Sequence, residues 1–161
     1  MGNISSLLYR KLTIENLIGV DVDQRMVDYA NMHRSNTKIK FMKEDMSEDW
    51  DKLSPELRAM EGKFDLIFSS FVFHFISDRL TAAKNILRLL APGGQLQAIA
   101  LCLADPFKDL TNGNSVKIDI PSAQKQMELW SRAFDQAGLR VDQANLFTFE
   151  EPLPKEVAES E

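Results

Sequence analysis

Apolar residues follow two different spacings along the chain, one typical of strands and one typical of helices. Short apolar runs with strand character occupy residues 17–21, 38–43, 64–70, 95–103 and 140–149. Between them, apolar side chains recur at helical spacing, which predicts helices over residues 4–12, after Asp23, over 50–60, over 80–90 and over 122–137. Strands and helices that alternate in this way, without an internal repeat, predict an open, mostly parallel α/β sheet with helices on both faces.

Capping residues mark where these helices begin and end. Asp23 suits an N-cap, and the helix after it carries an apolar stripe of Met26, Val27 and Ala30. The segment 91–94, Ala-Pro-Gly-Gly, stops a later helix because proline cannot continue a helix and glycine tolerates positive φ. That helix has a predicted core stripe of Leu80, Ala83, Leu87 and Leu90, and the last helix is expected to bury Trp130, Phe134 and Ala137 before Gly138 caps it.

The composition indicates the kind of protein and excludes some classes of partner. The 161 residues, 44% hydrophobic and 27% charged, fit one domain over residues 1–149 with an acidic flexible tail over 150–161. The formal net charge of -5, without a cluster of lysine or arginine, argues against nucleic acid as a partner. The longest apolar stretch, 98–104, is far shorter than the roughly 18 residues of a membrane span, so no membrane partner is expected. Cys102 is the single cysteine, which favours the reducing cytoplasm.

Ligands of open parallel sheets bind beyond the carboxyl ends of the strands. Asp21, Asp45 and the residues 69–74 end or follow three predicted strands. Asp21 stands where an acid in nucleotide-binding α/β folds accepts hydrogen bonds from both ribose hydroxyls, although a turn or cap aspartate at a strand end has the same appearance.

The sequence resembles the class I, Rossmann-like methyltransferases that use S-adenosylmethionine. Leu17-Ile18-Gly19-Val20-Asp21 with residues 26–30 is similar to the second strand and helix of that family, and residues 64–70 and 85–94 are similar to its fourth strand and its Leu-x-Pro-Gly-Gly stop. Within the family, the His-containing turn and Asp105-Pro106-Phe107 look most like arthropod juvenile hormone acid methyltransferases. The resemblance covers residues 2–149 and implies S-adenosylmethionine as cofactor, with an isoprenoid or fatty carboxylic acid as the small-molecule substrate.

The resemblance also implies a role for particular residues. Asp21 would hold the ribose, Val22 would pack on adenine, and Asp45 with Met46 would border the adenine edge. Ser69 would line the sulfonium side of the cofactor, and His74 and Phe75 would face the substrate entrance. Five of these residues also have an interpretation without a functional role. Val22, Met46 and Phe75 could be core residues, Asp45 a solvated loop acid, and His74 a residue at a helix start that is bonded to backbone. The resemblance implies no catalytic acid or base and no metal.

The chain departs from the family at its beginning. The family places a buried strand and a glycine-rich loop before its first helix, whereas here only Gly2 matches the last glycine of that loop. This match explains Gly2 better than the myristoylation pattern M-G-x-x-x-[ST], which residues 1–6 also fit. The missing strand is central in the family's sheet, and the family's last strand also has no counterpart here by sequence pattern, so we expect an incomplete, N-terminally truncated domain.

Loss of a central strand leaves two neighbouring strands with unpaired backbone groups. Three outcomes follow: the neighbours pair directly, a strand comes from another molecule, including self-association through the unpaired edge, or the chain is a fragment. A catalytically inactive methyltransferase-like protein is therefore the main alternative to an enzyme. A second alternative takes Asp21 and Asp23 as a metal-binding pair for a nucleotide sugar, but Asp23 is better explained as an N-cap.

Overall fold

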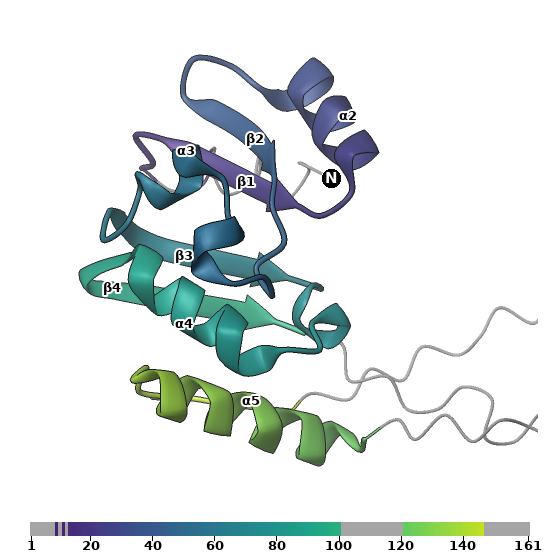
Figure 1. Cartoon of the computed structure of the whole chain (residues 1–161), viewed down its shortest axis with the longest axis vertical. Helices are drawn as coiled ribbons and strands as arrows, with labels where there is room; N and C mark the ends of the chain where they lie inside the picture. Colours follow the sequence, from purple (N-terminus) through teal and green to yellow (C-terminus); the bar gives the residue numbers. More distant parts are fainter. Residues whose placement is uncertain (1–8, 10, 12, 101–120, 147–161) are drawn as a thin grey trace, which may run out of the picture.

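The computed structural model describes residues 9, 11, 13–100 and 121–146. Figure 1 shows the elements along the chain. The strands are β1 (Leu17–Asp21), β2 (Ile39–Lys43), β3 (Phe64–Ser70) and β4 (Leu90–Ile99). The α-helices are α2 (Gln24–Arg34), α3 (Pro55–Arg58), α4 (Arg79–Leu89) and α5 (Ala123–Ala137), and two short 3₁₀ helices are η1 (Trp50–Lys52) and η2 (Phe73–Phe75). Tyr9 and Lys11 are helical, as the helix predicted over 4–12 requires, and the rest of that segment up to residue 12 lies outside the described residues. Gly2, Cys102, Asp105-Pro106-Phe107 and the tail 150–161 also lie outside them.

The described strands form two separate parallel pairs. β1 pairs with β2 from Leu17↔Ile39 to Asp21↔Lys43, and β3 pairs with β4 up to Ser70↔Ile99. β1 and β3 are not hydrogen-bonded to each other, so the neighbours of the expected missing strand have not closed up. The predicted α/β fold with parallel strands is confirmed, and the expected break in the sheet falls between β1 and β3.

Helices cover opposite faces of the two pairs. Ile39 and Phe41 share one face of β2 and form a buried cluster with Val27 and Ala30 of α2. Met42 points to the other face, as alternate residues of a strand do, and packs against a cluster of Leu53, Leu57 and Leu89. Phe64 and Ile67 of β3 pack on that same cluster. The cluster therefore bridges the two strand pairs on one face.

The capping predictions are confirmed. The Asp23 carboxylate accepts a hydrogen bond from the Arg25 N–H at 2.9 Å, and the Ser54 and Ser122 hydroxyls cap α3 and α5 in the same way. Gly138 ends α5 with a φ of 98°, a left-handed conformation that glycine adopts without a Cβ clash. The sequence reading of helix boundaries is therefore reliable where a capping residue is present.

Three sequence predictions of local structure are wrong. The helix predicted over 50–60 is broken into η1 and α3, because proline disfavours a helical conformation for the residue before it and Ser54 is extended. The predicted stripe of α4 is wrong in part: Ala83 and Leu90 are buried as expected, but Leu87 is exposed. The buried face also includes Ala82, Ile86 and Leu89, because α4 packs on both the sheet and α5. Residues 140–146, predicted as part of a strand, form none.

β4 also begins earlier than predicted. Leu90 pairs with Phe64, and the next pair is Leu66 with Gln95, so residues 91–94 bulge out of the strand. Gly93 has a φ of 82°, and a Cβ at Gly94 would lie 2.6 Å from the Phe64 carbonyl oxygen. Gly93 and Gly94 thus allow a bulge inside β4, whereas the sequence predicts a turn before the strand.

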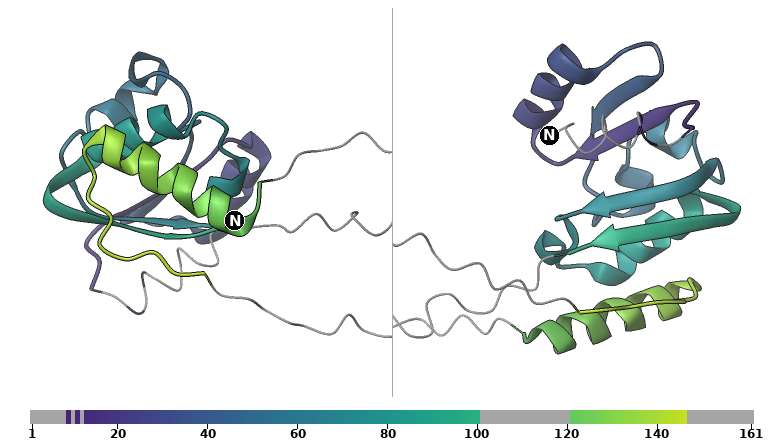
Figure 2. Two further views of the ribbon diagram at one scale, coloured as in Figure 1. Left: turned by 90° about the horizontal axis from the view of Figure 1, so that it is seen from below. Right: turned by 180° about the vertical axis from the view of Figure 1, so that it is seen from behind.

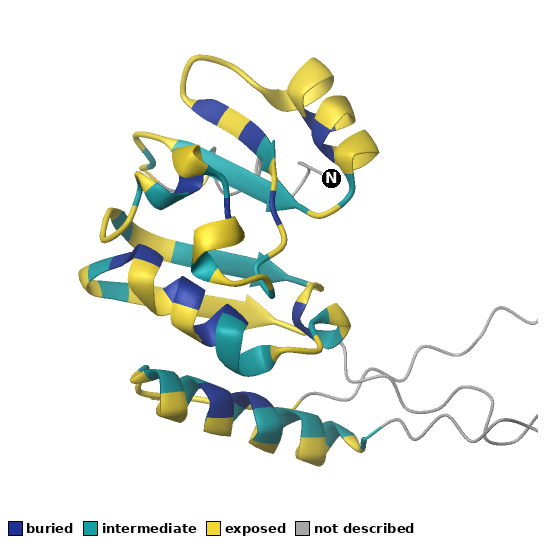
Figure 3. Ribbon diagram, in the orientation of Figure 1, coloured by how far each residue is buried: buried dark blue, intermediate teal, exposed yellow. Residues whose placement is uncertain are grey.

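One face of the β3–β4 pair has no cover among the described residues. Leu66, Gln95, Gln97 and Ile99 are exposed there, on the face opposite α4 (Figure 3). Figure 2 (right) shows β3 and β4 from this side without a described helix over them. Parallel sheets are usually covered on both faces, so this face is unusually open. No helix of the described part of the chain is long and apolar enough to span a membrane.

Asn85 joins the two strand pairs and offers a test of this packing. It is 2% exposed, and its side-chain amide donates to the Met46 and Glu48 carbonyl oxygens at 3.0 and 2.8 Å. Asn85→Ala removes a buried side-chain amide and leaves two part-buried carbonyl groups without this donor, so we expect a loss of about 2 kcal/mol in the free energy of unfolding. Urea unfolding measures this loss, with Lys84→Ala, an exposed position on the same helix, as control. A loss below about 0.5 kcal/mol would show that this link carries little stability.

Candidate functional site

The carboxyl ends of all four strands lie along one edge of the molecule (Figure 1). β1 and β3 are the two inner strands, with β2 on the outer side of β1 and β4 on the outer side of β3. The strand order therefore reverses between β1 and β3. In doubly wound sheets, ligands bind outside the carboxyl ends of the strands at such a switch point.

Asp21 closes β1 beside this switch point. Its side chain is half-buried, and its Oδ1 accepts a hydrogen bond from the Asp23 N–H at 2.9 Å. Its carbonyl oxygen accepts the Glu44 N–H at 3.0 Å, which ties the end of β1 to the segment after β2. Both attachments fix the direction of the carboxylate while leaving it partly accessible to solvent. A fixed, accessible carboxylate can accept hydrogen bonds from paired hydroxyl groups.

Asp23 has a different environment from Asp21. Its carboxylate forms an ion pair with Arg25 at 2.7 Å and caps α2. The hydrogen bond from the Arg25 side chain is the main reason that the pKa of Asp23 falls to about 2. Within the described ranges, no group of three or more potential metal ligands occurs. The structure therefore favours the N-cap interpretation of Asp23 over the metal-binding pair.

Exposed apolar side chains gather at the same edge. Val22 follows β1 and is 58% exposed, Phe71 and Val72 follow β3, and Ile99 ends β4. Phe75 in η2 is 79% exposed. Exposed apolar groups beside a fixed carboxylate suit a ligand that has both hydroxyl groups and a flat apolar surface. The alternative interpretation of Val22 and Phe75 as core residues is therefore wrong.

Phe71 was not singled out from the sequence. Its φ is 57°, the left-handed region that bulky residues rarely adopt. Its N–H donates to the Ile99 carbonyl oxygen at 2.8 Å, so the strained residue is held at the carboxyl ends of both β3 and β4. Backbone strain of this kind clusters at functional sites. No sequence signal apart from its place after a strand could have identified it.

Asp45 and Met46, the two residues expected to border adenine, have different surroundings in the structure. Asp45 is exposed, and its Oδ1 accepts hydrogen bonds from the Ser47 N–H and hydroxyl at 2.9 and 2.6 Å. Met46 is half-buried and packs against the core clusters on both sides of it. Asp45 thus lies on an ordered turn after β2, whereas the Met46 side chain contributes to the core.

Ser69 and His74 lie at the end of β3 and in η2. Ser69 is half-buried and pairs with Ala98. Phe73 stacks on Trp130 of α5 at 4.3 Å between ring centroids and so anchors η2. The His74 ring lies 4.0 Å from the Phe75 ring, and its Nδ1 is buried without a hydrogen-bond partner among the described residues. Burial lowers the pKa of His74, which favours the neutral form of the imidazole.

Glu44 is a second residue that sequence reasoning missed. It is 7% exposed, its Oε2 accepts the Ser54 N–H at 3.3 Å, and its Oε1 has no partner among the described residues. It lies directly after β2, beside Asp21. No sequence signal distinguishes Glu44 from its acidic neighbours, because its burial depends on the path of the chain into α3.

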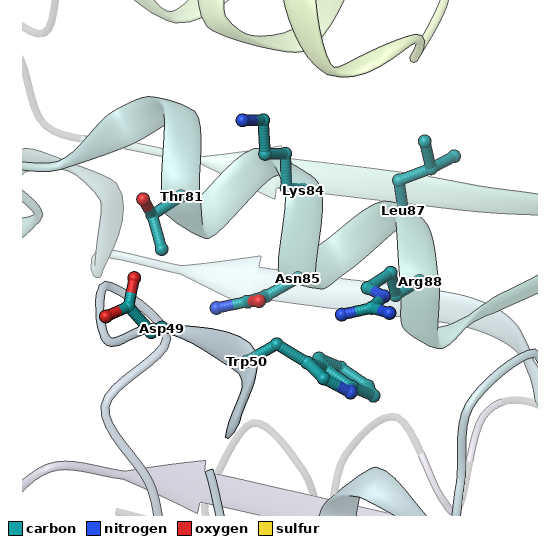
Figure 4. Close-up of a pocket in the computed structure, with 7 residues that line it drawn as sticks. All are labelled: Asp49, Trp50, Thr81, Lys84, Asn85, Leu87 and Arg88. Atoms are coloured by element: carbon teal, nitrogen blue, oxygen red, sulfur yellow. The ribbon is translucent and has the colours of Figure 1, made fainter. Parts of the chain in front are cut away.

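A pocket of about 340 Å³ lies elsewhere, between η1 and α4 (Figure 4). Arg88 covers the Trp50 ring at 4.6 Å and is paired with Glu61, and Asn85 is bonded to backbone. Its lining includes none of the residues predicted to form the cofactor site. Because Asp49, Asn85 and Arg88 already have partners within the chain, the pocket is better explained as part of the packing between α4 and η1.

The strand order and the switch point define a Rossmann-like α/β protein. The family model described as "Methyltransferase domain" matches residues 1–98, and the chain belongs to this family of class I S-adenosylmethionine-dependent methyltransferases.

Two curated relatives are similar to parts of the chain. Juvenile hormone acid O-methyltransferase of Bombyx mori is 33% identical over 95 residues, covering 58% of this chain and 32% of that protein. O-methyltransferase phiE of a fungal species is 35% identical over 94 residues, covering 55% of this chain and 30% of that protein. The chain thus spans about a third of the length of these relatives.

The fold also resembles a solved structure. A chain from the complex between the Haloferax volcanii Trm112 methyltransferase activator and a methyltransferase aligns with a TM-score of 0.64 and 18% identity, covering 95% of this chain and 64% of that chain. At this identity, the likeness shows a shared fold.

The buried imidazole of His74 predicts a pH effect on stability. Because the folded protein lowers the pKa of His74 below its ordinary value of 6.5, the unfolded chain takes up the proton first as the pH falls. Stability contributed by neutral His74 is therefore complete above pH 6.5 and declines below it. His74→Gln should make the urea midpoint fall less between pH 7.5 and 5.5 than in the parent. An unchanged dependence would show that this ring is not desolvated.

Proposed function

We propose that this protein transfers a methyl group from S-adenosylmethionine to an oxygen atom of a small-molecule carboxylic acid of the isoprenoid or fatty-acid class. Membership of the family supports methyl transfer. Both curated relatives are named as O-methyltransferases, which supports an oxygen acceptor, and the Bombyx mori relative is named for a hormone acid, which supports a carboxylic acid. The observation that carries the proposal is the position of Asp21 at the switch point.

The residues at the carboxyl edge fit the nucleoside part of this cofactor. The Asp21 carboxylate would accept the ribose hydroxyls, and the exposed Val22 side chain offers an apolar surface for adenine. Asp45 would border the adenine edge from its turn after β2, with Met46 supporting that turn from the core. Ser69, at the end of β3, would face the methionine part, as would Gly2, which lies outside the described residues.

When bound, S-adenosylmethionine supplies an electrophilic methyl group on a sulfonium. A carboxylate acceptor is already ionised near pH 7, since carboxyl pKa values lie near 4, so the protein need not remove a proton from it. The task of the chain's own residues is to align the acceptor oxygen and to exclude water. Phe75 and Phe71 offer apolar surface for a hydrocarbon chain, and His74 lies against the Phe75 ring in η2.

A second candidate is a methyltransferase-like protein without activity. It is favoured by the lack of pairing between β1 and β3, because the Asp21 side and the Ser69 side of the site belong to different strand pairs. Such a protein would lack tight binding of the cofactor, and binding therefore distinguishes the two candidates.

Titration with labelled S-adenosylmethionine tests the cofactor site. We expect saturable binding, and we expect Asp21→Asn to raise the dissociation constant about tenfold or more, because hydrogen bonds to a charged group contribute about 1.5–3 kcal/mol. Asparagine can still accept the Asp23 N–H, so the turn is retained. Asp28→Asn removes the same charge from an exposed site on α2 and should leave binding unchanged. Absence of binding to the parent chain would favour the inactive candidate.

Methyl transfer to a panel of acceptors tests the substrate class. We expect product from isoprenoid and long-chain fatty acids and none from their methyl esters or alcohols, because only the acids present an ionised oxygen near pH 7. Phe75→Ala should raise KM for these acids about tenfold through lost apolar contact, with little change in cofactor binding. Activity on amines or phenols alone would reject a carboxylic acid substrate.

A further inference from the structure

Glu44 closes the neck of the segment that connects β2 to α3. Its Oε2 accepts a hydrogen bond from the N–H of Ser54, ten residues further along the chain, at 3.3 Å. Its own N–H donates to the Asp21 carbonyl oxygen at 3.0 Å. One residue therefore joins the end of β1 to both ends of the segment 44–54.

The turn that carries Asp45 lies inside this closed segment. The Asp45 side chain accepts two hydrogen bonds from Ser47, and the Asp45 carbonyl oxygen accepts the Glu48 N–H at 3.1 Å. Asn85 of α4 holds the same turn from the side of the second strand pair, because its amide donates to two carbonyl oxygens of the turn. Glu44 is the corresponding attachment on the side of β1.

A carboxylate is a costly side chain at this position. Glu44 is 7% exposed, and its Oε1 is buried without a hydrogen-bond partner among the described residues. Leu53, next to Ser54, is 2% exposed and belongs to the apolar cluster that bridges the two strand pairs. A buried charged group costs free energy unless its lone pairs are satisfied, and an apolar side chain of similar size often stabilises a protein equally well or better. The acid is therefore better explained by what it positions than by its packing.

We propose that Glu44 is a positioning residue that holds the Asp45 turn at a fixed place relative to Asp21, and that this placement selects adenine over other purines. The inference rests on the proposed function, in which Asp21 accepts the ribose hydroxyls and Asp45 borders adenine. Adenine presents an exocyclic amino group, which donates to a carboxylate, whereas hypoxanthine presents a carbonyl oxygen there, which a carboxylate repels. Asp45 is exposed to an approaching ligand, and it distinguishes the two bases only if its turn stays in place.

Binding of two matched ligands to the whole chain tests this selection. S-inosylhomocysteine differs from S-adenosylhomocysteine in carrying an oxygen in place of the amino group, and the measured quantity is the ratio of the two dissociation constants. We expect the parent to prefer the adenine compound about tenfold or more, and Glu44→Met to reduce this preference to about threefold or less, because methionine has a similar length but cannot accept the Ser54 N–H. Glu44→Gln keeps an acceptor oxygen and should keep the ratio within about twofold of the parent.

The ratio separates positioning from folding. A variant that is partly unfolded loses apparent affinity for both ligands by the same factor, so its ratio does not change. Phe134→Leu, which alters the core beside Trp130 on α5, is the control, because it lowers stability and should leave the ratio unchanged. The proposal is overturned if Glu44→Met keeps the parent's ratio, if Glu44→Gln loses the preference to the same extent, or if the parent binds both ligands equally.

Amide hydrogen exchange without ligand tests the positioning step separately from the proposed function. We expect Glu44→Met to speed exchange at Ser47, Glu48 and Ser54 at least about tenfold, with amides in the middle of α5 unchanged, and Glu44→Gln to resemble the parent. Unchanged exchange in Glu44→Met would reject the positioning role even if the ligand ratio changed. If the parent binds neither ligand, the proposed function fails and the selection of adenine fails with it, while the exchange rates still show whether Glu44 holds the turn.

Discussion

Backbone pairing within two parallel strand pairs is the constraint on which the rest of the structure depends. Each pair is closed by a helix, α2 over β1–β2 and α4 over β3–β4, so each is a complete strand–helix–strand unit. Because the strands of both pairs run the same way, all four carboxyl ends reach one edge. Unpaired buried backbone groups cost about 1–3 kcal/mol each, which is large beside a domain stability of about 5–15 kcal/mol. The break between the pairs is therefore the energetically weakest part of the fold.

Packing on one face holds the pairs together in place of backbone bonds. The cluster of Leu53, Leu57 and Leu89 receives Met42 from one pair and Ile67 from the other. Asn85 reinforces it by bonding α4 to the chain after β2. Hydrophobic contacts are less directional than strand pairing, so they fix the distance between the pairs less strictly than a central strand would. The opposite face of β3–β4 adds nothing to this connection, since its residues are exposed.

Much of this arrangement is predictable from local sequence signals. The strands at 17–21 and 64–70 and the caps Asp23 and Gly138 are correctly predicted, because each depends on the residue itself and its nearest neighbours. The wrong predictions concern features that depend on contacts between residues far apart in the sequence. The buried face of α4 is set by packing on α5, the bulge at 91–94 by pairing with β3, and the exposure of Val22 and Phe75 by the path of neighbouring loops. Phe71 and Glu44 were missed for the same reason.

In the proposed function, the two strand pairs contribute different parts of the site. Asp21, Val22 and Asp45 follow strands of the first pair, whereas Ser69, Phe71 and His74 follow the second. A ligand that reaches from the ribose site to the acceptor must contact both pairs, so its affinity depends on their relative position as well as on each contact. In the proposed function, η2 forms the acceptor end, and Phe73 anchors η2 on α5. Substrate choice can therefore change through η2 and α5 while the Asp21 half of the site keeps its geometry, which is why a shared fold does not determine the acceptor.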